Sequence, residues 1–212
     1  SEMIDRKTLH NFQNSMTRYK ESYHYKALEA ISGKGEGHSH GGIDTIHSMD
    51  INKLKSYQDM LVFDSYVKNS FLDHITDYSL SLENFYDGSF RRYSDFIGTP
   101  FEYVSIEKDR VVIDALGEIK GEQSFGAKIE KDFALLNDGI EFEIKLDSSC
   151  DYNLRYVCEF NLHFQNQEEV DIGGLGEIDR HIFKAQKSIV LKDNSLKREI
   201  VIEFDRDVEF FV

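Results

Sequence analysis

The sequence contains no tryptophan, only two cysteines and no long apolar run. No stretch approaches the ~20 apolar residues that a membrane-spanning helix requires, so we exclude a transmembrane segment. The sequence also opens without a charged and then apolar leader, so we expect no secretory signal. The lack of tryptophan argues against a carbohydrate-binding platform, because large aromatic faces are what stack on sugar rings.

The two cysteines, Cys150 and Cys158, lie in a strand-like region and form no CxxC pair. We predict that both are reduced thiols in a cytoplasmic protein. The alternative is a disulfide across a hairpin, with the two residues on facing strands. That disulfide would require an oxidising compartment, which nothing else in the sequence indicates.

The overall composition indicates a folded domain with an acidic surface. Of the 212 residues, 40% are hydrophobic and 13% aromatic, which favours a globular protein over a disordered one. The net charge of −14 repels phosphate backbones and anionic membranes, so we exclude nucleic acid and membrane surfaces as partners. It does not oppose a neutral ligand such as a sugar.

From Phe101 onwards, apolar and polar residues alternate in the pattern of strands that are buried on one face. Polar turns separate these segments at Lys108-Asp109, at Asn137-Asp138-Gly139 and at Asp193-Asn194. Seven or more such strands predict a mainly β fold, an antiparallel β-sandwich over residues 1–212. Residues 166–179 carry a glycine run without a following Lys-Ser or Lys-Thr, so we interpret them as a plain connecting loop.

The first third of the chain predicts a few short helices, over residues 20–31 and 50–61. Between them, residues 32–48 form a loop in which five residues are glycine. His38, His40 and His47 in this loop are weak candidates for a transition-metal site. We favour a flexible polar loop with incidental imidazoles, because glycine-rich flexibility opposes a preorganised site.

The stretch 57–104 is the most aromatic part of the chain. Within it, residues 79–96, here called the aromatic segment, are rich in aromatic side chains and carry two adjacent arginines. Its notable side chains are Phe85, Tyr86, Phe90, Arg91, Arg92, Tyr93 and Phe96. One interpretation is a carbohydrate platform, with rings that stack on sugars and charged groups that bind hydroxyls. The other, which aromatic clusters represent more often, is a core or a seam between domains.

The residues alone indicate a binding or scaffolding domain rather than an enzyme. Acidic pairs such as Glu102 and Glu107 are expected on the solvent face of alternating strands, and sequence does not reveal the separation that glycoside hydrolysis needs. No nucleophile elbow or reactive-cysteine motif occurs. We therefore assign no catalytic residue and no cofactor.

Several motifs, taken in order, resemble a known family. They are Met16 to His24, Thr45-Ile46-His47, Leu54, Phe63 to Val67, Ser70 to His74, Asp95-Phe96-Ile97, Pro100-Phe101-Glu102 and Glu203 to Arg206. This set is similar to the C-terminal domain of the α-amylase/4-α-glucanotransferase branch of glycoside hydrolase family 57. The sequence departs from the family pattern at Ser48, where the family often has Asp, and at Val67-Lys68, where it has Arg-Arg.

The resemblance implies a galactose-mutarotase-like β-sandwich, packed against a catalytic (β/α) barrel in a longer glycoside hydrolase. The family's nucleophilic Glu and acidic Asp belong to the barrel, and no part of this chain matches them. The implied partners are that barrel and an α-glucan or maltooligosaccharide. Candidates for carbohydrate binding or for the barrel interface are His47, Asp73, His74, Tyr86, Phe90, Arg91, Arg92 and Tyr93.

Three hypotheses follow. The first is a non-catalytic accessory domain of an α-glucan-acting enzyme, which would stabilise the barrel and hold glucan. The second is an independent carbohydrate-binding module. The third is a mutarotase-like enzyme or a metal protein that uses His47, His74 or His163, and a mutarotase would need a histidine and a carboxylate converging in a cleft.

Overall fold

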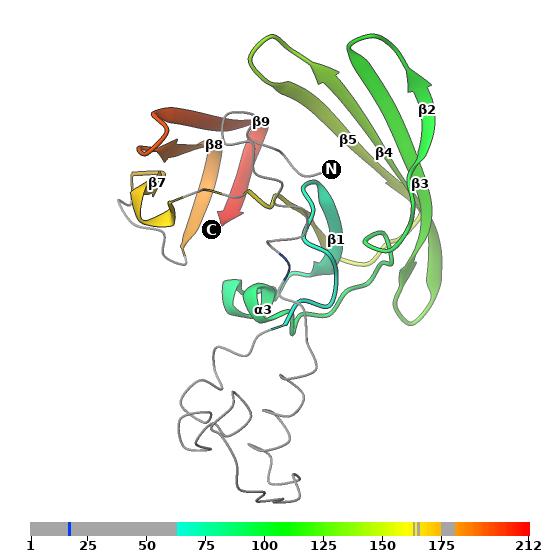
Figure 1. Cartoon of the computed structure of the whole chain (residues 1–212). Coiled ribbons are helices and arrows are strands. Elements are labelled where there is room, and N and C mark those ends of the chain that lie inside the picture. The colour runs from blue at the N-terminus through cyan, green and yellow to red at the C-terminus, as the bar shows by residue number, and fades with distance from the viewer. Residues whose placement is uncertain (1–16, 18–62, 163, 165, 175–180) are drawn as a thin grey trace, which may run out of the picture. The chain divides into compact units, whose positions relative to one another are not determined.

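The computed structural model describes residues 17, 63–162, 164, 166–174 and 181–212. They belong to two compact units, one that includes Asn69–Val212 and one formed by Gln13–Lys68, and each is described by itself. Figure 1 shows that the described part of the first unit consists mainly of strands. In the second unit, Lys68 donates its backbone N–H to Thr17 Oγ1 over 2.9 Å, and its Nζ lies 2.9 Å from Tyr66 Oη.

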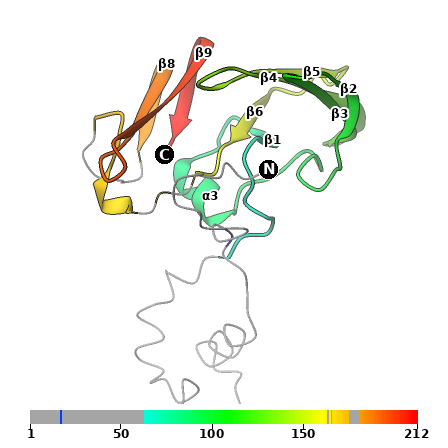
Figure 2. The ribbon, with the colours of Figure 1, turned by 45° about the horizontal axis from the view of Figure 1, so that its top comes forward.

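The strands of the first unit form three antiparallel sheets, with the orders β1-β6, β2-β3-β4-β5 and β7-β8-β9 (Figures 1 and 2). The elements are β1 (Leu72–Asp77), α3 (Leu82–Asp87), β2 (Glu102–Ile106), β3 (Arg110–Lys120), β4 (Ser124–Leu135), β5 (Ile140–Ser148), β6 (Leu154–Glu159), the 3-10 helix η3 (Gln167–Glu169), β7 (Val170–Ile172), β8 (Ile182–Asp193) and β9 (Arg198–Phe211). The predicted mainly β, antiparallel fold is confirmed.

The four-stranded sheet is a meander whose turns the sequence predicts. Glu107 N–H donates to Arg110 O over 2.8 Å in the turn between β2 and β3. Leu136 N–H donates to Gly139 O over 2.9 Å between β4 and β5. The second turn falls at Asn137-Asp138-Gly139, as the sequence predicts.

The two faces of this sheet differ in chemistry. One face carries exposed and half-exposed ion pairs, such as Lys128 with Asp114 at 2.8 Å and Lys145 with Glu143 at 3.1 Å. The other face buries a core made of Ala115, Ile119, Ala127 and Ile129 from the sheet, together with Ile75 and Phe96. The period-two alternation in the sequence produces this division, because successive side chains of a strand point to opposite faces.

The segment between α3 and β2 joins the β1-β6 sheet to the four-stranded sheet. Tyr93 N–H donates to Ile75 O over 2.7 Å, and Tyr93 O accepts from Lys120 N–H over 2.6 Å. Isolated bridges on either side pair Arg92 with Thr76 and Ser94 with Ile119. The aromatic segment thus connects the two sheets through its backbone.

The third sheet has its own core of Val170, Ile172, Ile189 and Leu191. Its β8-β9 hairpin turns after Asp193, as predicted. The interpretation of residues 166–179 as a plain loop is wrong for its first part, because residues 167–172 form η3 and β7. Val170 and Ile172 fill the core beside β8, and this burial outweighs the polar, glycine-rich composition of the segment.

A chain of phenylalanine rings links the second and third sheets. Phe142 of β5 lies 6.1 Å from Phe204 of β9 between ring centroids, and Phe204 lies 5.7 Å from Phe210. On the other side, Phe71 lies 5.2 Å from Phe142 and 4.7 Å from Phe160. Edge-to-face contacts of this kind add to the stability that burial supplies.

The remaining predictions concern the two cysteines, membrane-spanning helices and the first third of the chain. Neither cysteine forms a disulfide, and the alternative that they face each other in one hairpin is wrong, because Cys158 of β6 pairs with Asp73 of β1. Among the described residues, no helix is long and apolar enough to cross a membrane. The helices predicted over 20–31 and 50–61 and the loop 32–48 lie outside the described residues.

Candidate functional site

Strand β1 is buried on both faces, which is unusual for the polar sequence Leu-Asp-His-Ile-Thr-Asp. Its residues 73–76 are all at most 2% exposed. Because side chains alternate along a strand, Asp73 and Ile75 share the face toward the four-stranded sheet, and His74 shares the opposite face with Thr76. The His74 ring lies 5.4 Å from the rings of both Phe85 and Phe90.

Asp73 anchors the first of two buried polar networks. Its Oδ2 lies 2.5 Å from Lys131 Nζ of β4, and its Oδ1 accepts a hydrogen bond of 2.7 Å from Tyr156 Oη. Lys131 Nζ also donates to Phe71 O over 2.6 Å and lies 4.4 Å from the centroid of the Phe101 ring. The buried ammonium thus has a carboxylate, a carbonyl and an aromatic face around it, which offsets part of its lost hydration.

Two ionisable groups beside Asp73, the Tyr156 phenol and the Cys158 thiol, have raised pKa values. Burial raises the pKa of the Tyr156 phenol far above its ordinary value, and the neighbouring Cys158 and Asp73 raise it further. Burial also raises the pKa of the Cys158 thiol to about 12, with Asp73 as the next cause. Cys158 is therefore a protonated thiol at neutral pH, which is the unreactive form.

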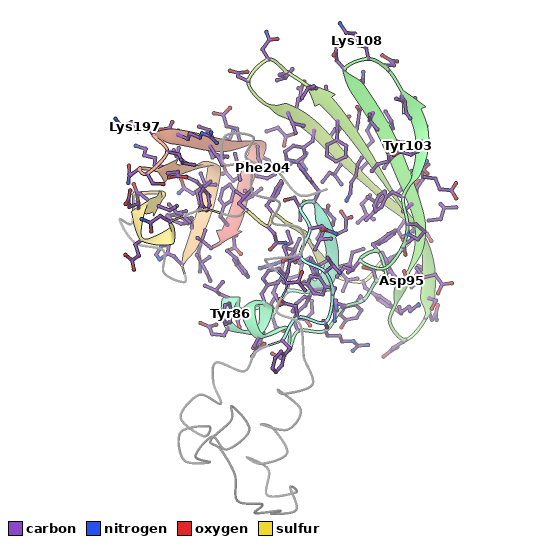
Figure 3. All side chains as sticks on the ribbon, in the orientation of Figure 1. Tyr86, Asp95, Tyr103, Lys108, Lys197 and Phe204 are labelled. Carbon is purple, nitrogen blue, oxygen red and sulfur yellow. The ribbon has the colours of Figure 1, made fainter. Side chains whose placement is uncertain are left out.

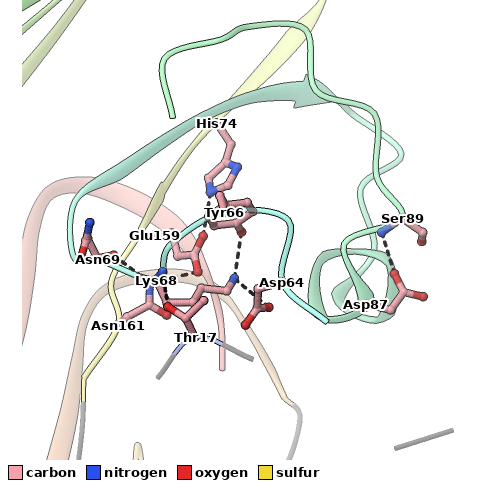
Figure 4. Close-up of polar contacts among 10 residues, drawn as sticks. All are labelled: Thr17, Asp64, Tyr66, Lys68, Asn69, His74, Asp87, Ser89, Glu159 and Asn161. Atoms are coloured by element: carbon pink, nitrogen blue, oxygen red, sulfur yellow. Dashed lines mark hydrogen bonds and ion pairs between the residues drawn. The ribbon is translucent and has the colours of Figure 1, made fainter. Parts of the chain in front are cut away.

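His74 anchors the second network, shown in Figure 4. Its Nε2 lies 2.7 Å from Glu159 Oε2. Asn161 Nδ2 donates to Glu159 Oε1 over 3.0 Å and to Asn69 O over 2.8 Å. Ser70 Oγ donates to the Asn161 carbonyl over 2.9 Å, so the network ties the start of β1 to the end of β6.

A histidine beside a carboxylate is the pair that a mutarotase-like enzyme would need. Here the side chains are 0% and 6% exposed, and Phe85 and Phe90 flank the imidazole. A sugar ring cannot reach this imidazole without displacing the aromatic side chains beside it. The geometry therefore supports a structural role for the pair, in which His74 Nε2 and Glu159 Oε2 are partners inside the protein.

The predicted site residues divide into buried and exposed sets. Asp73 and His74 belong to the networks above, and Phe90 is buried in a ring stack with Phe85 at 5.2 Å. Arg92 and Tyr93 are half-buried, and the Arg92 guanidinium lies 5.7 Å from the Phe90 ring. His74 contacts Phe90, and Tyr93 packs against the core that contains Ile75, so these contacts hold the aromatic segment against β1.

Two of the candidates reach the surface. Arg91 is exposed, and its guanidinium lies 4.4 Å from the Tyr93 ring. Tyr86 is 42% exposed on α3, where Figure 3 labels it. Helix α3 is short because Ser81 caps its start, accepting a hydrogen bond from Asn84 N–H, and Gly88 ends it with a φ of 73°.

The partners that make the buried networks were not predicted from the sequence; they are Lys131, Tyr156, Glu159 and Asn161. A signal for Lys131 was present, since it occupies the inward position of β4 between Ile129 and Phe133. A charge on an otherwise apolar face indicates a buried partner. Glu159 and Asn161 carry no such signal, because they lie at a strand end where polar residues are common.

Among the residues that the structure describes, no group of three His, Cys, Asp or Glu side chains could hold a metal ion. The candidate residues His38, His40, His47 and His163 lie outside those residues. The fold and its buried networks define an antiparallel β-sheet module whose polar cluster stabilises the packing.

A family model described as "Alpha-amylase/4-alpha-glucanotransferase, C-terminal" matches residues 1–212. The chain belongs to this family, as its motifs indicated. It is similar to the 4-alpha-glucanotransferase of Thermococcus litoralis, with 26% identity over 198 residues, 88% of this chain and 29% of that protein. It is also similar to Alpha-amylase 1 of Dictyoglomus thermophilum, with 28% identity over 160 residues, 73% of this chain and 21% of that protein.

A solved structure supports the same assignment of fold. The crystal structure of the Thermococcus litoralis 4-alpha-glucanotransferase matches with a TM-score of 0.66 and 21% identity, covering 78% of this chain and 24% of that one. The chain therefore spans less than a third of the length of each of these relatives.

Proposed function

We propose that this chain is the non-catalytic accessory domain of an α-glucan-acting enzyme of the α-amylase/4-α-glucanotransferase type, and that it packs against the catalytic barrel. The observation that carries the proposal is the match of the C-terminal family model over the whole chain, while the chain spans only 29% and 21% of the two relatives. In such relatives most of the polypeptide lies outside the region that this chain resembles.

The buried networks favour this role over catalysis by the chain itself. Lys131, Asp73, His74 and Glu159 are the described groups that most resemble a reactive site, and each is at most 7% exposed. A catalytic group must reach the proton or atom that it acts on. Residues 1–212 therefore act as one supporting module, and hydrolysis or transfer of glucan belongs to the rest of the enzyme.

The same module holds α-glucan or maltooligosaccharide at its surface. Among the predicted binding residues that the structure describes, Tyr86 and Arg91 are the exposed ones, and an aromatic ring and a charged donor suit sugar rings and hydroxyls. We place the protein in the cytoplasm, since its two cysteines form no disulfide. If the chain works alone, this surface would instead make it an independent carbohydrate-binding module.

Calorimetric titration of the 212-residue chain with maltooligosaccharides tests the binding part. We expect heat of binding that disappears in the variants Tyr86→Ala and Arg91→Ala. Tyr103→Ala is the matched control, because Tyr103 is 73% exposed but lies on β2, away from the aromatic segment. Absence of heat in the unmodified chain would limit the role to support of the barrel.

A further inference from the structure

The inner face of the four-stranded sheet is buried at only one of its ends. Toward the β3-β4 turn, Ala115, Ile119 and Ile129 are at most 3% exposed. Toward the opposite end, where the β2-β3 and β4-β5 turns lie, large apolar side chains are open to solvent. We call these residues the open patch: Tyr103 is 73% exposed, Ile106 65%, Leu135 63% and Ile140 45%.

The strand register places the open patch on the same face as the core. Tyr103 pairs with Ile113, which pairs with Lys131, and Leu135 pairs with Ile140. Ile106 pairs with Val111, which continues to Phe133. Because paired residues point to the same face, the open patch extends the face that carries Lys131 and Ile129. Figure 3 labels Tyr103 on β2 and Lys108 at the neighbouring turn.

The outer face of the sheet is mainly charged, although Leu116 is 74% exposed there. On the outer face, charged residues neutralise one another, as in the pairs Arg110 with Asp132 and Lys128 with Asp114. An antiparallel sheet commonly has one face exposed to solvent and one face packed against the core. The open patch belongs to the inner face, yet no residue that the structure describes covers it, and contiguous exposed apolar surface marks an interaction site.

We infer that the open patch is the surface onto which the catalytic domain of the longer enzyme packs; this inference rests on the proposed function above. The two relatives carry more than two thirds of their length outside the matched region, which supplies an occupant in the same polypeptide. A stable complex between separate proteins buries roughly 20–30 residues from each partner, and the open patch has only four apolar side chains. Two domains of one chain need less, because their linkage supplies a high effective concentration.

The composition of the open patch also argues against α-glucan as its occupant. Three of its four side chains are aliphatic, and Tyr103 is the one that carries a hydroxyl. A sugar site requires several converging polar groups for its hydroxyls. A second copy of this chain remains an outcome that the experiment must separate.

The test is hydroxyl-radical footprinting of the full-length gene product that contains this chain, read by mass spectrometry at Leu135 and Leu116. The two leucines form a matched pair, because Leu116 is 74% exposed on the outer face of the same sheet and Leu135 is 63% exposed on the inner face. We expect several-fold slower oxidation of Leu135 than of Leu116. In addition, Leu135→Glu should separate the melting of the two domains, whereas Leu116→Glu should leave their joint melting unchanged.

Each other outcome has a distinct meaning. Equal oxidation of the two leucines in a gene product that is active on α-glucan overturns this inference and leaves the proposed function intact. Protection of Leu135 that disappears on dilution indicates a second copy, and protection that requires added maltooligosaccharide indicates glucan; both overturn the inference. A gene product with no α-glucan activity overturns the proposed function itself, and the inference with it.

Discussion

Lys131 Nζ lies 2.5 Å from Asp73 Oδ2, with only 4% and 2% of the two side chains exposed. The pair joins β4 to β1, two strands that belong to different sheets. A buried ion pair contributes little compared with apolar residues of the same size, but removal of one partner leaves an uncompensated charge. The pair therefore determines where β1 packs on the four-stranded sheet.

Removal of the ammonium should be severely destabilising. We expect Lys131→Met to lower the free energy of unfolding by about 3–5 kcal/mol, measured by urea denaturation, because Asp73 then stays buried without its cation. The double variant Asp73→Asn with Lys131→Met should recover much of this loss, since the amide oxygen still accepts from Tyr156. Lys128→Met is the matched control on the outer face of the same strand, and it should change stability little. Equal effects of the two lysine variants would contradict the assignment.

The buried thiol predicts a loss of stability at alkaline pH. The ordinary pKa of 9.0 applies to the unfolded chain, and burial raises the pKa of Cys158 to about 12 in the folded protein. Its contribution is therefore complete below pH 9 and is lost as the pH rises from 9 toward 12, because the unfolded state then releases the proton first. The Tyr156 pKa is also raised, so it acts in the same direction above pH 10.

Urea denaturation between pH 8 and pH 10.5 checks this prediction. We expect Cys158→Ala to reduce the pH dependence of the free energy of unfolding, while Cys150→Ala, which keeps the buried thiol, should preserve it. An unchanged slope in Cys158→Ala would show that the thiol is not the group that titrates.

Gly117 tests the packing of the aromatic segment on β3. A Cβ atom at this position would lie 2.9 Å from Phe96 Cε1, and the Phe96 ring is 2% exposed in the core. We expect Gly117→Ala to cost about 1–3 kcal/mol in thermal or urea unfolding, because the ring cannot move without disturbing its neighbours. Gly126→Ala is the control on the adjacent strand, where a Cβ would meet nothing within 4 Å. A cost for Gly126→Ala as large as that for Gly117→Ala would rule out this packing.

The sequence predicts those parts of the fold that depend on residues adjacent to one another along the chain. The turn at Asp138-Gly139 is recognisable because it depends only on adjacent residues. The alternation of apolar and polar residues that follows it determines which face of the strand is buried. The pairing of Asp73 with Cys158 joins strands far apart in the chain, and no local pattern specifies it. The aromatic segment was ambiguous for the same reason, since whether Phe90 faces solvent or His74 depends on where β1 lies.

We propose that this chain supports an α-glucan-acting enzyme without performing chemistry itself. The most direct measurement compares the full-length gene product with the 212-residue chain in assays of maltooligosaccharide hydrolysis, transfer and sugar anomerisation. We expect hydrolysis or transfer by the full-length protein and no turnover in any assay by the 212-residue chain alone. Turnover by the chain alone, above all anomerisation that Glu159→Gln abolishes, would contradict it.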